Sequence, residues 1–557
     1  MGQLSIAVSM NRKQFIQWAV TFTGISCLFA SCKPKKKIKG GIVGASANIG
    51  HLLRDKGFEE PLHISKQQTV IIGAGISGLS AAYQLRKWGI DDFIVLDLEA
   101  ADGGNSVCSA NAVSAYPWGA HYVPIPNNSL KEYLEFLGEA GVVTGMSNEG
   151  LPIYNEYHLC FDPEERLYIN GRWQEGLIPH FGVPGNDKKE IGTFLATMNR
   201  YRYQTGVDGK DAFAIPANAS SKDTALVQLD TITMKQWMQK KGFKSPYLHW
   251  YVDYCTRDDF GTPYDKVSAW AGIHYFAGRK GKGANATHSD VLTWPEGNGF
   301  LVRALQTRFA AKVQTNSLAV SVAVVDEGVT IDYYDVQSQK LKRIEAAQCI
   351  MAVPQFVASR LLKDERRKAF VQQHFKYVPW MVANLTVTNL EERSGAPLSW
   401  DNVIYESKSL GYVEATHQGI TQSKPKKNLT YYLPLTDGEV GIDRKTAQHR
   451  SYEEWVEIIF ADLKKVHPDI EAATEEINVM IWGHAMAQPL PGVIHGNARL
   501  QLGQSMNDRV HFAHTDLAGV SVFEEGFYQG LEAAKKVRDN LLLSGRSVQT
   551  NSGQQTT

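Results

Sequence analysis

The feature that most constrains the fold is a buried strand that runs directly into a glycine-rich turn and then a helix. Residues 69–72 are apolar and β-branched, a pattern typical of a buried parallel strand. Gly73, Gly75 and Gly78 follow with the spacing G-x-G-x-x-G, and residues 79–85 repeat apolar side chains at helical spacing. This order predicts an α/β domain built on a parallel sheet, with the glycine turn at the carboxyl end of the first strand.

The same turn is predicted to hold the phosphates of a dinucleotide. Gly73 permits the tight turn, and Gly75 lets the backbone approach a pyrophosphate. Gly78 lets the helix pack closely on the strand. Ile76 and Ser77 open that helix, whose first turn attracts phosphate through its free N–H groups and its positive dipole end.

A second predicted strand, residues 92–97, ends in a carboxylate. Asp97 stands 19 residues after Gly78, close to the spacing of about 20 residues for an acid that grips a ribose hydroxyl. A glycine-rich turn without a ligand is the alternative interpretation. Strand, turn, helix, second strand and acid together favour a bound dinucleotide.

Residues 97–105 distinguish which dinucleotide is expected. They resemble the second flavin fingerprint of the flavin-containing amine oxidase superfamily, in which an acid precedes Gly-Gly-Arg. The resemblance assigns Asp97 to the ribose, and Gly103 and Gly104 to a close approach of the cofactor. Asn105 replaces the usual arginine, so one positive phosphate contact is expected to be absent.

Two later segments extend the resemblance. Residues 293–322 look like the family segment whose backbone binds adenine, with Ala319 at the contact. Residues 510–530 look like the last FAD motif, which includes Asp516 and Phe523 and covers the pyrophosphate and the ring. The resemblance therefore implies FAD as the cofactor and a single interleaved enzyme that spans nearly all of the mature chain.

A second strand-plus-glycine fingerprint, as expected for NAD, is absent from the sequence. Residues 278–283 are basic and glycine-rich but lack the flanking strand, helix and acid, so a mobile surface loop is predicted there. With one dinucleotide only, electrons are expected to leave to oxygen, a quinone or another acceptor.

The predicted fold class is α/β: an FAD-binding Rossmann-like domain of the amine oxidase type, interleaved with an α+β substrate domain. Within the tether, residues 41–46 are predicted to form a flexible arm. The predicted segments are an export signal peptide (1–32), a lysine-rich tether (33–65), three FAD-domain segments (66–130, 291–360 and 495–545), two substrate-domain segments (131–290 and 361–494) and a disordered tail (546–557).

By the resemblance, three parts of the chain reach the flavin ring. His121 lies in a stretch that passes the isoalloxazine, although its aromatic neighbours also suit a hydrophobic core. Asn384 or Ala383 stands where amine oxidases carry a lysine that holds a water against flavin N5, and the absence of that lysine disfavours rapid reaction with oxygen. Trp482, His484 and Phe523 fall at the family's aromatic substrate cage, of which one wall is incomplete here.

Composition excludes several other classes of protein. The chain of 557 residues carries 58 basic and 58 acidic side chains, so it lacks the excess of positive charge that binds nucleic acid. The six cysteines form no C-x-x-C pair and there is no H-E-x-x-H motif, so no metal site is predicted. Beyond residue 32 no apolar run is long enough to span a bilayer.

The first 32 residues have the parts of an export signal. Arg12 and Lys13 precede the modestly apolar residues 18–30, which are too short and polar for a comfortable transmembrane helix. Residues 28–32 resemble a bacterial lipobox that would lipidate Cys32, and the segment around Arg12 resembles a twin-arginine signal with lysine in the second place. The sequence thus predicts a bacterial envelope protein on the periplasmic side, lipid-anchored to a membrane; an uncleaved amphipathic N-terminus is the alternative.

These observations predict an FAD-dependent oxidoreductase that oxidises a C–N bond of an amine, polyamine-like or other, by hydride transfer to the flavin. One alternative is a dehydrogenase or desaturase that acts on a non-amine substrate with a membrane acceptor. The absent lysine and the incomplete cage favour that alternative. A non-catalytic, membrane-tethered flavoprotein is the third hypothesis, because intact FAD motifs suit all three.

Overall fold

The computed structural model describes most of the chain, namely residues 37–55, 57–390, 393–419 and 425–545. The predicted export signal with Cys32, the start of the tether and the predicted tail lie outside the described residues. Contacts divide the chain into residues 1–39 and residues 40–557, and the fold below is that of the second unit.

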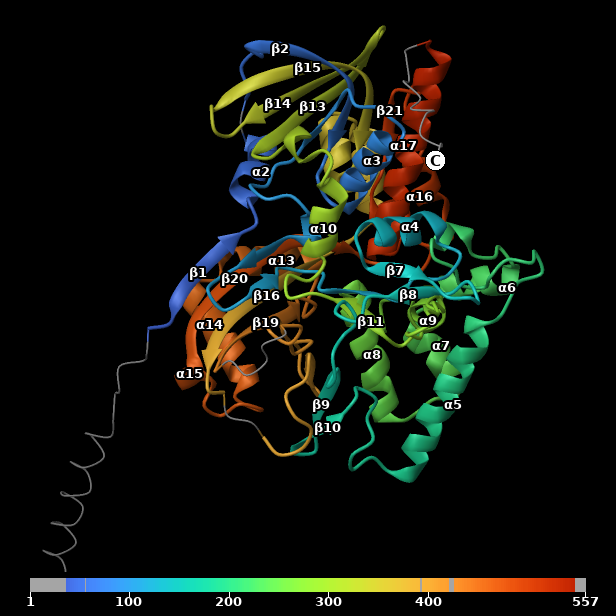
Figure 1. Cartoon of the computed structure of the whole chain (residues 1–557), viewed down its shortest axis with the longest axis vertical. Helices are drawn as coiled ribbons and strands as arrows, with labels where there is room; N and C mark the ends of the chain where they lie inside the picture. Colours follow the sequence, from blue (N-terminus) through green and yellow to red (C-terminus); the bar gives the residue numbers. More distant parts are fainter. Residues whose placement is uncertain (1–36, 56, 391–392, 420–424, 546–557) are drawn as a thin grey trace, which may run out of the picture. The chain divides into compact units, whose positions relative to one another are not determined.

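Within the described residues, the first sheet has seven strands (Figure 1). Strands β12, β3, β2, β15 and β21 run parallel, and the antiparallel hairpin of β14 and β13 extends the sheet from β15. These strands come from three distant parts of the chain, as an interleaved α/β fold requires. Their bounds are β2 (His63–Ile72), β3 (Phe93–Leu96), β12 (Val313–Gln314), β13 (Ser317–Val325), β14 (Gly328–Asp335), β15 (Lys340–Met351) and β21 (Val510–Phe512).

Two helices that are far apart in the sequence pack tightly against each other beside this sheet, and glycines permit close packing around them. A Cβ atom on Gly530 would lie 2.3 Å from the carbonyl oxygen of Ser77. A Cβ atom on Gly78 would lie 1.8 Å from the carbonyl oxygen of Gly73. A larger residue at Gly530 would therefore push the two helices apart, and a larger residue at Gly78 would push α3 away from the turn at Gly73 and from Ala352, which follows β15. The helices are α3 (Ile76–Lys87) and α17 (Phe523–Leu543), with α10 (Gly299–Gln306) also packed on α3.

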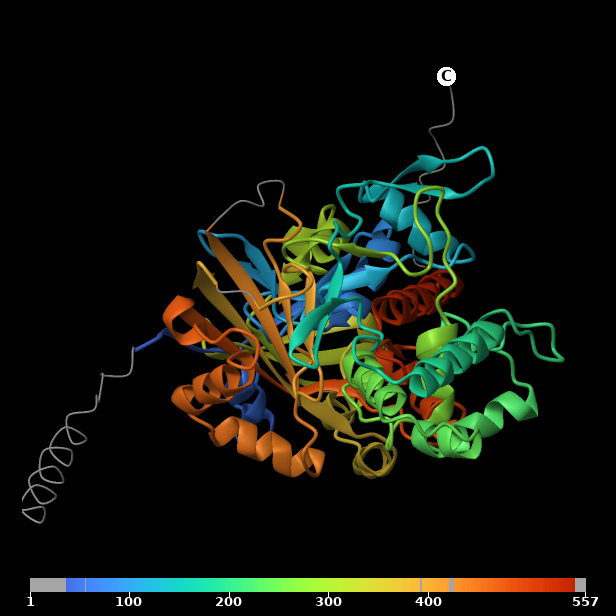
Figure 2. The same cartoon turned by 90° about the horizontal axis from the view of Figure 1, so that it is seen from below.

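The second sheet has eight strands among the described residues, in the order β1, β20, β16, β19, β18, β17, β9 and β10. Figure 2 shows it beside the first sheet, with helices on both sides. The bounds are β1 (Lys39–Gly44), β9 (Glu165–Ile169), β10 (Arg172–Glu175), β16 (Tyr377–Thr388), β17 (Asp401–Ile404), β18 (Tyr412–Glu414), β19 (Lys426–Pro434) and β20 (Thr474–Ala487).

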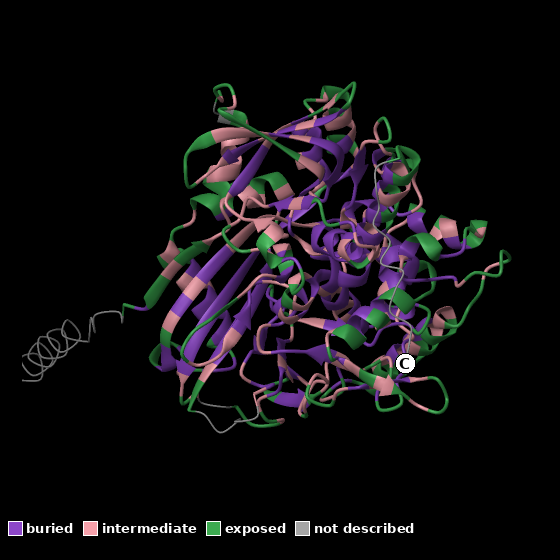
Figure 3. Cartoon of the chain, turned by 45° about the horizontal axis from the view of Figure 1, so that its top comes forward, coloured by how far each residue is buried: buried purple, intermediate pink, exposed green. Residues whose placement is uncertain are grey.

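Two groups of helices cover the second sheet. Helices α13 and α14 pack against β16 and β20, whereas α5, α7, α8 and α9 share one large apolar core with the side chains of β16, β17 and β19. Figure 3 shows this core as continuous buried segments between the sheets and the helices. The bounds are α5 (Gly185–Arg202), α7 (Met234–Lys240), α8 (Pro246–Phe260), α9 (Ala269–Ala277), α13 (Val440–His449) and α14 (Tyr452–Leu463).

The expectation that residues 41–46 form a flexible arm is wrong. They belong to β1, which pairs with the edge of β20, and to the turn that leads into α2 (Ala47–Asp55). The Ser46 hydroxyl donates a hydrogen bond of 2.7 Å to the carboxylate of Glu99. An unpaired sheet edge presents free N–H and C=O groups, and β1 provides hydrogen-bond partners for these groups along the edge of β20.

Short elements complete the described chain. Hairpins β4–β5 and β7–β8 and the two-stranded sheet of β6 with β11, whose strands are far apart in the chain, lie outside the two large sheets. Across the described residues, no helix combines the length and the apolar character that crossing a bilayer requires. The remaining bounds are β4 (Cys108–Ala110), β5 (Ala115–Pro117), β6 (Tyr122–Pro124), β7 (Val143–Met146), β8 (Pro152–Tyr154), β11 (Val291–Thr293), α4 (Lys131–Glu139), α6 (Thr224–Val227), α11 (Gln355–Leu361), α12 (Glu365–His374), α15 (Ile470–Ala473) and α16 (Asn497–Leu502).

Candidate active site

The two glycine-rich turns lie against each other at the carboxyl end of the first sheet. The N–H of Gly103 donates to the carbonyl of Ala74 over 2.8 Å. A Cβ atom on Gly104 would come within 3.1 Å of the Cα of Gly75. Because no side chain projects between these turns, the backbone is open to a close ligand. We call this region, residues 73–78 together with 103–104, the glycine cradle.

Helix α3 leaves the cradle with its first turn available for a phosphate. Gly75 occupies the N-cap position and no side chain caps the helix. The N–H groups of the first turn therefore lack the intrahelical and capping partners that most helices provide. Ile76 and Ser77 open this turn, so the cradle and the helix end together have the geometry to hold an anion.

Asp97 follows β3 and fastens the cradle to the second strand. Its carboxylate accepts the N–H of Ala74 over 2.5 Å and the N–H of Glu99 over 2.8 Å. Burial raises its pKa to about 6, although these two hydrogen bonds oppose that shift. Each carboxylate oxygen retains a further lone pair, so the same group can also accept a hydrogen bond from a ribose hydroxyl.

The four other residues that the resemblance assigns to the cofactor lie outside the glycine cradle. Asn105 donates its side-chain N–H to the carbonyl of Ala485 over 2.6 Å, which joins the cradle to the second sheet. Ala319 is buried on β13. Asp516 is buried where β21 ends, and Phe523 opens α17 at the wall of the cavity described below.

Asp516 is the centre of a satisfied polar cluster. It accepts the hydroxyl of Tyr377 over 2.6 Å and the N–H of Gln355 over 2.8 Å, and Nδ1 of His514 lies 2.8 Å from its other oxygen. Burial alone would raise the pKa of Asp516, but His514 and the two donors lower it below its ordinary value. The cluster fixes the loop between β21 and α17.

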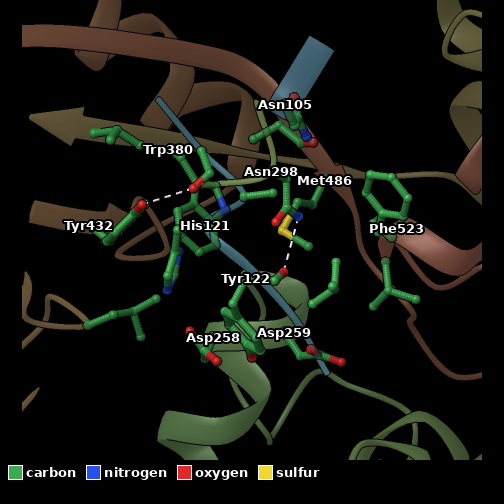
Figure 4. A pocket seen from close by; sticks show the side chains of 18 of the residues that line it. Asn105, His121, Tyr122, Asp258, Asp259, Asn298, Trp380, Tyr432, Met486 and Phe523 are labelled. Carbon is green, nitrogen blue, oxygen red and sulfur yellow. Dashed lines mark hydrogen bonds between the residues drawn. The ribbon is translucent and has the colours of Figure 1, made fainter. Parts of the chain in front are cut away.

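A cavity opens beside the cradle, between the two sheets and α8. It encloses about 880 Å³, including its open mouth, which is within the range of small-molecule sites. In Figure 4, Asn105 lies at one end and Asp258 and Asp259 lie at the other. The cavity therefore extends from the cofactor side of the molecule to the carboxylates of α8.

Four charged side chains make the cavity acidic. Asp258, Asp259 and Glu524 line it together with Arg279, which pairs with Asp259 over 2.8 Å. Burial and the neighbouring charge of Asp259 raise the pKa of Asp258 to about 7, although Arg279 opposes this. Burial also raises the pKa of Glu524. One arginine thus stands against three carboxyl groups.

Aromatic rings form the opposite wall. His121 and Tyr432 lie with ring centroids 4.8 Å apart, and Trp380 and Trp482 line the same cavity. The Tyr432 hydroxyl donates to the carbonyl of Gly119 over 2.9 Å (Figure 4). Burial lowers the pKa of His121 to about 4, so the ring is neutral at physiological pH. His121, Trp482 and Phe523 thus line one cavity.

Asn384, which the resemblance predicted beside the flavin, is not among the described residues that line the cavity. Its side-chain N–H donates to the carbonyl of Pro117 over 2.9 Å, and its oxygen accepts the hydroxyl of Thr430 over 2.6 Å. On the same strand, Trp380 and Val382 line the cavity and Asn384 lies beyond its end. Its hydrogen bonds hold the loop after β5 against the second sheet.

The expected place of His484 in the substrate cage is wrong. Its ring stacks on Phe356 with centroids 4.2 Å apart, outside the set of residues that line the cavity. The cause is a bulge, because Trp482 and Met486 of β20 oppose Trp380 and Val378, which are only two residues apart. The two extra residues disrupt the strict alternation of sides that a regular strand would impose.

Sequence reasoning missed most of the charged lining. Asp258 and Asp259 belong to α8, whose adjacent acids on a largely buried helix were a visible signal. Arg279 lies in the stretch 278–283, where the expectation of a mobile surface loop is wrong, because this side chain pairs with Asp259 inside the cavity. Tyr432 belongs to no sequence motif whose spacing could have placed it at the cavity.

The glycine cradle lies in the part of the chain that matches a known family model. Residues 71–137 match the family model of an NAD(P)-binding Rossmann-like domain. Human prenylcysteine oxidase 1 is 29% identical over 218 residues, which cover 38% of this chain and 41% of that protein. Human mitochondrial dimethylglycine dehydrogenase is 32% identical over 85 residues, or 15% of this chain and 10% of that protein. The chain therefore spans less than half the length of these curated relatives.

Solved structures match over far more of the chain. A redesigned putrescine oxidase has a TM-score of 0.61 at 16% identity and covers 86% of this chain and 100% of its own. Cyclohexylamine oxidase from Brevibacterium oxydans has a TM-score of 0.59 at 14% identity, with the same coverage. The chain has the amine oxidase fold. A fatty acid isomerase from P. acnes shares this fold, with a TM-score of 0.56 at 14% identity over 86% of this chain and 98% of its own.

The amine oxidase fold confirms the predicted architecture, and the residues present fit FAD. The cradle has the backbone space that a pyrophosphate needs, because a Cβ atom on Gly75 would meet only the Cα of Gly104, at 3.9 Å. The uncapped start of α3 supplies N–H donors, and Asp97 supplies an acceptor for ribose. Asn105 and Phe523 lead from the cradle into the cavity, where the ring of such a cofactor would meet a substrate.

Proposed function

We propose that this protein is an FAD-dependent oxidoreductase that oxidises the C–N bond of an amine by hydride transfer to the flavin. The observation that carries the proposal is the charge of the cavity. Asp258, Asp259 and Glu524 face it, and only Arg279 compensates them among the described lining residues. A low-dielectric cavity lined by carboxylates favours a cation over a neutral or anionic substrate.

The aromatic wall supports an amine in a second way. Trp380, Trp482 and Tyr432 present rings to the same space that the carboxylates face. Ring faces attract ammonium groups through their quadrupole, by about 1 kcal/mol per favourable contact. The structural neighbours named above include oxidases of putrescine and cyclohexylamine, which are amines. The apolar rings would also exclude water from the reacting carbon.

The chemistry divides between cofactor and protein. Bound FAD would supply the two-electron acceptor, as flavins do generally. The cradle and Asp97 would hold its phosphates and ribose, and Phe523 and Asn105 would border its ring. Asp258 and Asp259 would bind the ammonium group, and the ring of His121 would pack against the substrate as a neutral surface.

A second candidate is a flavin dehydrogenase that acts on a non-amine substrate and passes electrons to a quinone or another membrane acceptor. Two observations favour it. Among the described residues that line the cavity none is a lysine. The relative that matches over 218 residues is named a prenylcysteine oxidase, and a prenylcysteine carries a thioether. A catalytically inactive flavoprotein is the third candidate.

One set of measurements separates the candidates. The purified chain should show visible flavin absorbance, and a folded but colourless protein would contradict FAD binding. Amines should bleach that absorbance without oxygen. Bleaching by thioethers and not by amines would establish the second candidate, and bleaching by neither class would favour the third. Peroxide released in air would identify oxygen as the acceptor.

We also propose that the protein is exported to the bacterial envelope and anchored by a lipid on Cys32, on the periplasmic side. The export signal and the lipobox-like residues 28–32 support this proposal. A Cys32→Ser variant should leave the membrane fraction for the soluble fraction. Unchanged membrane attachment would contradict lipidation at this residue.

A further inference from the structure

A second chamber lies next to the cavity, one helical turn away along the same face of α8. Its inner wall is made of aromatic and thiol side chains, and Glu165 stands among them. The exposed Glu175, Ile178 and His180 border the same chamber, which therefore reaches the surface. It encloses about 680 Å³, including its open mouth. The inner wall consists of Tyr251, Tyr254, Cys255 and Tyr275.

Helix α8 lines both spaces with successive turns. Tyr251, Tyr254 and Cys255 line the second chamber, and Asp258, one turn after Tyr254, lines the catalytic cavity. Side chains four residues apart lie on one face of a helix, so Tyr254 and Asp258 are neighbours. The wall between the two spaces is therefore about one helical turn thick.

Two further carboxyl groups stand next to this turn. Asp401 on β17 and Glu165 on β9 are register partners in adjacent parallel strands, so their side chains project to the same face of the sheet. The Tyr254 hydroxyl donates to Asp401 over 3.4 Å. In the described part of the chain, no ion pair reaches Asp258, Asp401 or Glu165, whereas Asp259 is paired with Arg279. The result is a run of unpaired carboxyl groups from the cavity to the second chamber.

We infer that Asp258 takes the proton from the ammonium group of a bound amine, and that Asp401 and Glu165 pass this proton to the second chamber. The inference rests on the proposed function, because it requires an amine substrate. It assigns a catalytic residue, Asp258, and an exit for protons that is separate from the entrance for substrate.

The proton step balances without another reactant. An N–H bond of the ammonium breaks and its electron pair stays on nitrogen, while an O–H bond forms on Asp258. The ammonium and the carboxylate thereby become a neutral amine and a neutral acid, which costs little in a low-dielectric cavity. The amine lone pair is then available to assist loss of hydride from the adjacent carbon. The proton moves on through the Tyr254 hydroxyl to Asp401, then to Glu165, and from there to solvent in the second chamber.

The surroundings of Asp258 suit a base near neutral pH. Burial and the charge of Asp259 raise its pKa to about 7, and Glu165 acts in the same direction. Arg279 and a hydrogen bond from Tyr122 oppose the shift. Burial, then Glu165 and Asp258, raise the pKa of Asp401 well above its ordinary value. The groups that face Asp258 are Asp259 and Cys255 on α8, Tyr122 on β6, Glu165 on β9, Asp401 on β17, Tyr432 on β19, Tyr254 on α8, Tyr275 on α9 and Arg279 after α9.

The first test is Asp258→Asn in the flavin-loaded protein, with an amine that bleaches the wild type. The rate of anaerobic flavin reduction at neutral pH should fall about 100-fold, and the rise of that rate with pH through about 7 should disappear. Asp258→Glu keeps the carboxyl group and should restore part of both. A difference infrared spectrum across neutral pH, recorded without substrate, should lose one protonated-carboxyl band in Asp258→Asn. An unchanged pH profile with unchanged infrared bands would overturn the inference.

The second test is Glu165→Gln, with Glu164→Gln as the matched control on the adjacent residue. In the wild type, a pH indicator should report proton release together with flavin bleaching. In Glu165→Gln, release should lag about tenfold or more behind bleaching, while Glu164→Gln should behave like the wild type. Equal release in both variants would overturn the exit route. If no amine bleaches the wild type, the proposed function itself fails, and that result is distinct from either outcome.

Discussion

The glycine cradle and the cavity beside it are built in opposite ways. The cradle is made by backbone, from residues 73–78 and 103–104, and its shape depends on side chains that are absent. The cavity is made by side chains from β6, α8, β16, β19, β20 and α17, and its character depends on their charges and rings. Adding atoms to the cradle should therefore weaken flavin binding. Exchanging charges or rings in the cavity should instead change substrate binding and catalysis.

The largest effect is expected where an added side chain separates α3 from α17. A Cβ atom on Gly530 would lie 2.3 Å from the carbonyl oxygen of Ser77 and 2.8 Å from the nitrogen of Ala81. Gly530→Val should cost about 3 kcal/mol or more of unfolding free energy and should abolish flavin retention. Gly192→Ala is the control, because a Cβ atom there meets nothing within 4 Å and should stabilise α5 by about 0.5 kcal/mol. Urea unfolding and visible absorbance measure both, and a stable, yellow Gly530→Val would contradict the packing account.

The next effect tests whether the cradle depends on its acid. Asp97→Ala removes the acceptor for the N–H groups of Ala74 and Glu99. Loss of charge-assisted hydrogen bonds of about 2 kcal/mol should weaken FAD binding about 30-fold. Asp102→Ala is the matched control, because its carboxylate accepts a long hydrogen bond of 3.4 Å from Gln306 and lies outside the cradle. Titration of the apoprotein with FAD gives both affinities, and equal losses would show that Asp97 has no special role.

A third prediction concerns the charge of the cavity. The pKa of Asp258 is raised from 3.8 to about 7, so the protonated acid favours the folded state. Its contribution to stability is full below pH about 4 and is lost as pH rises through about 7. The melting temperature of the wild type should therefore fall by a few degrees more than that of Asp258→Asn between mildly acidic and mildly basic pH. Identical slopes in the apoproteins would contradict the assignment.

A smaller effect is expected at the aromatic wall. Trp482 donates its indole N–H to the carbonyl of Trp118 over 2.7 Å and so supports the loop that carries His121. Trp482→Phe keeps a ring but removes this hydrogen bond, worth about 1 kcal/mol. KM for an amine should rise about fivefold with flavin content unchanged. A change in kcat alone would show that the ring acts on the reacting atoms and not on binding.

The smallest effect is expected at His484, which the bulge of β20 turns away from the cavity. Its ring stacks on Phe356. Burial and the charges of Arg444 and Arg360 lower its pKa to about 3. His484→Phe keeps a flat, neutral ring and should change kcat/KM less than about twofold. A large loss of activity without a loss of stability would indicate that His484 contacts the substrate.

The contrast between cradle and cavity also shows which features the sequence can predict and which it cannot. The glycines, Asp97 and the following strand act within one local βαβ unit, so their spacing determines their geometry. The resemblance places Asn384 and His484 by their positions along the chain, which do not record that β20 bulges and that Asn384 bonds to Pro117 away from the cavity. Residues 41–46 were misread because the edge of β20 that they cover is more than 400 positions away in the chain.

By itself, the sequence determined a Rossmann-like α/β domain and its cradle, because short-range spacing dictates backbone shape, whereas the interleaving of the segments was implied only by the family resemblance. Only the tertiary structure decided the acidic cavity, where Asp258 and Arg279 meet Tyr432 across more than 150 residues of chain. It also decided the second chamber and the pairing of Asp401 with Glu165. The physical reason is that a buried charge acquires its properties from neighbours that the fold brings together, and no spacing rule records those neighbours.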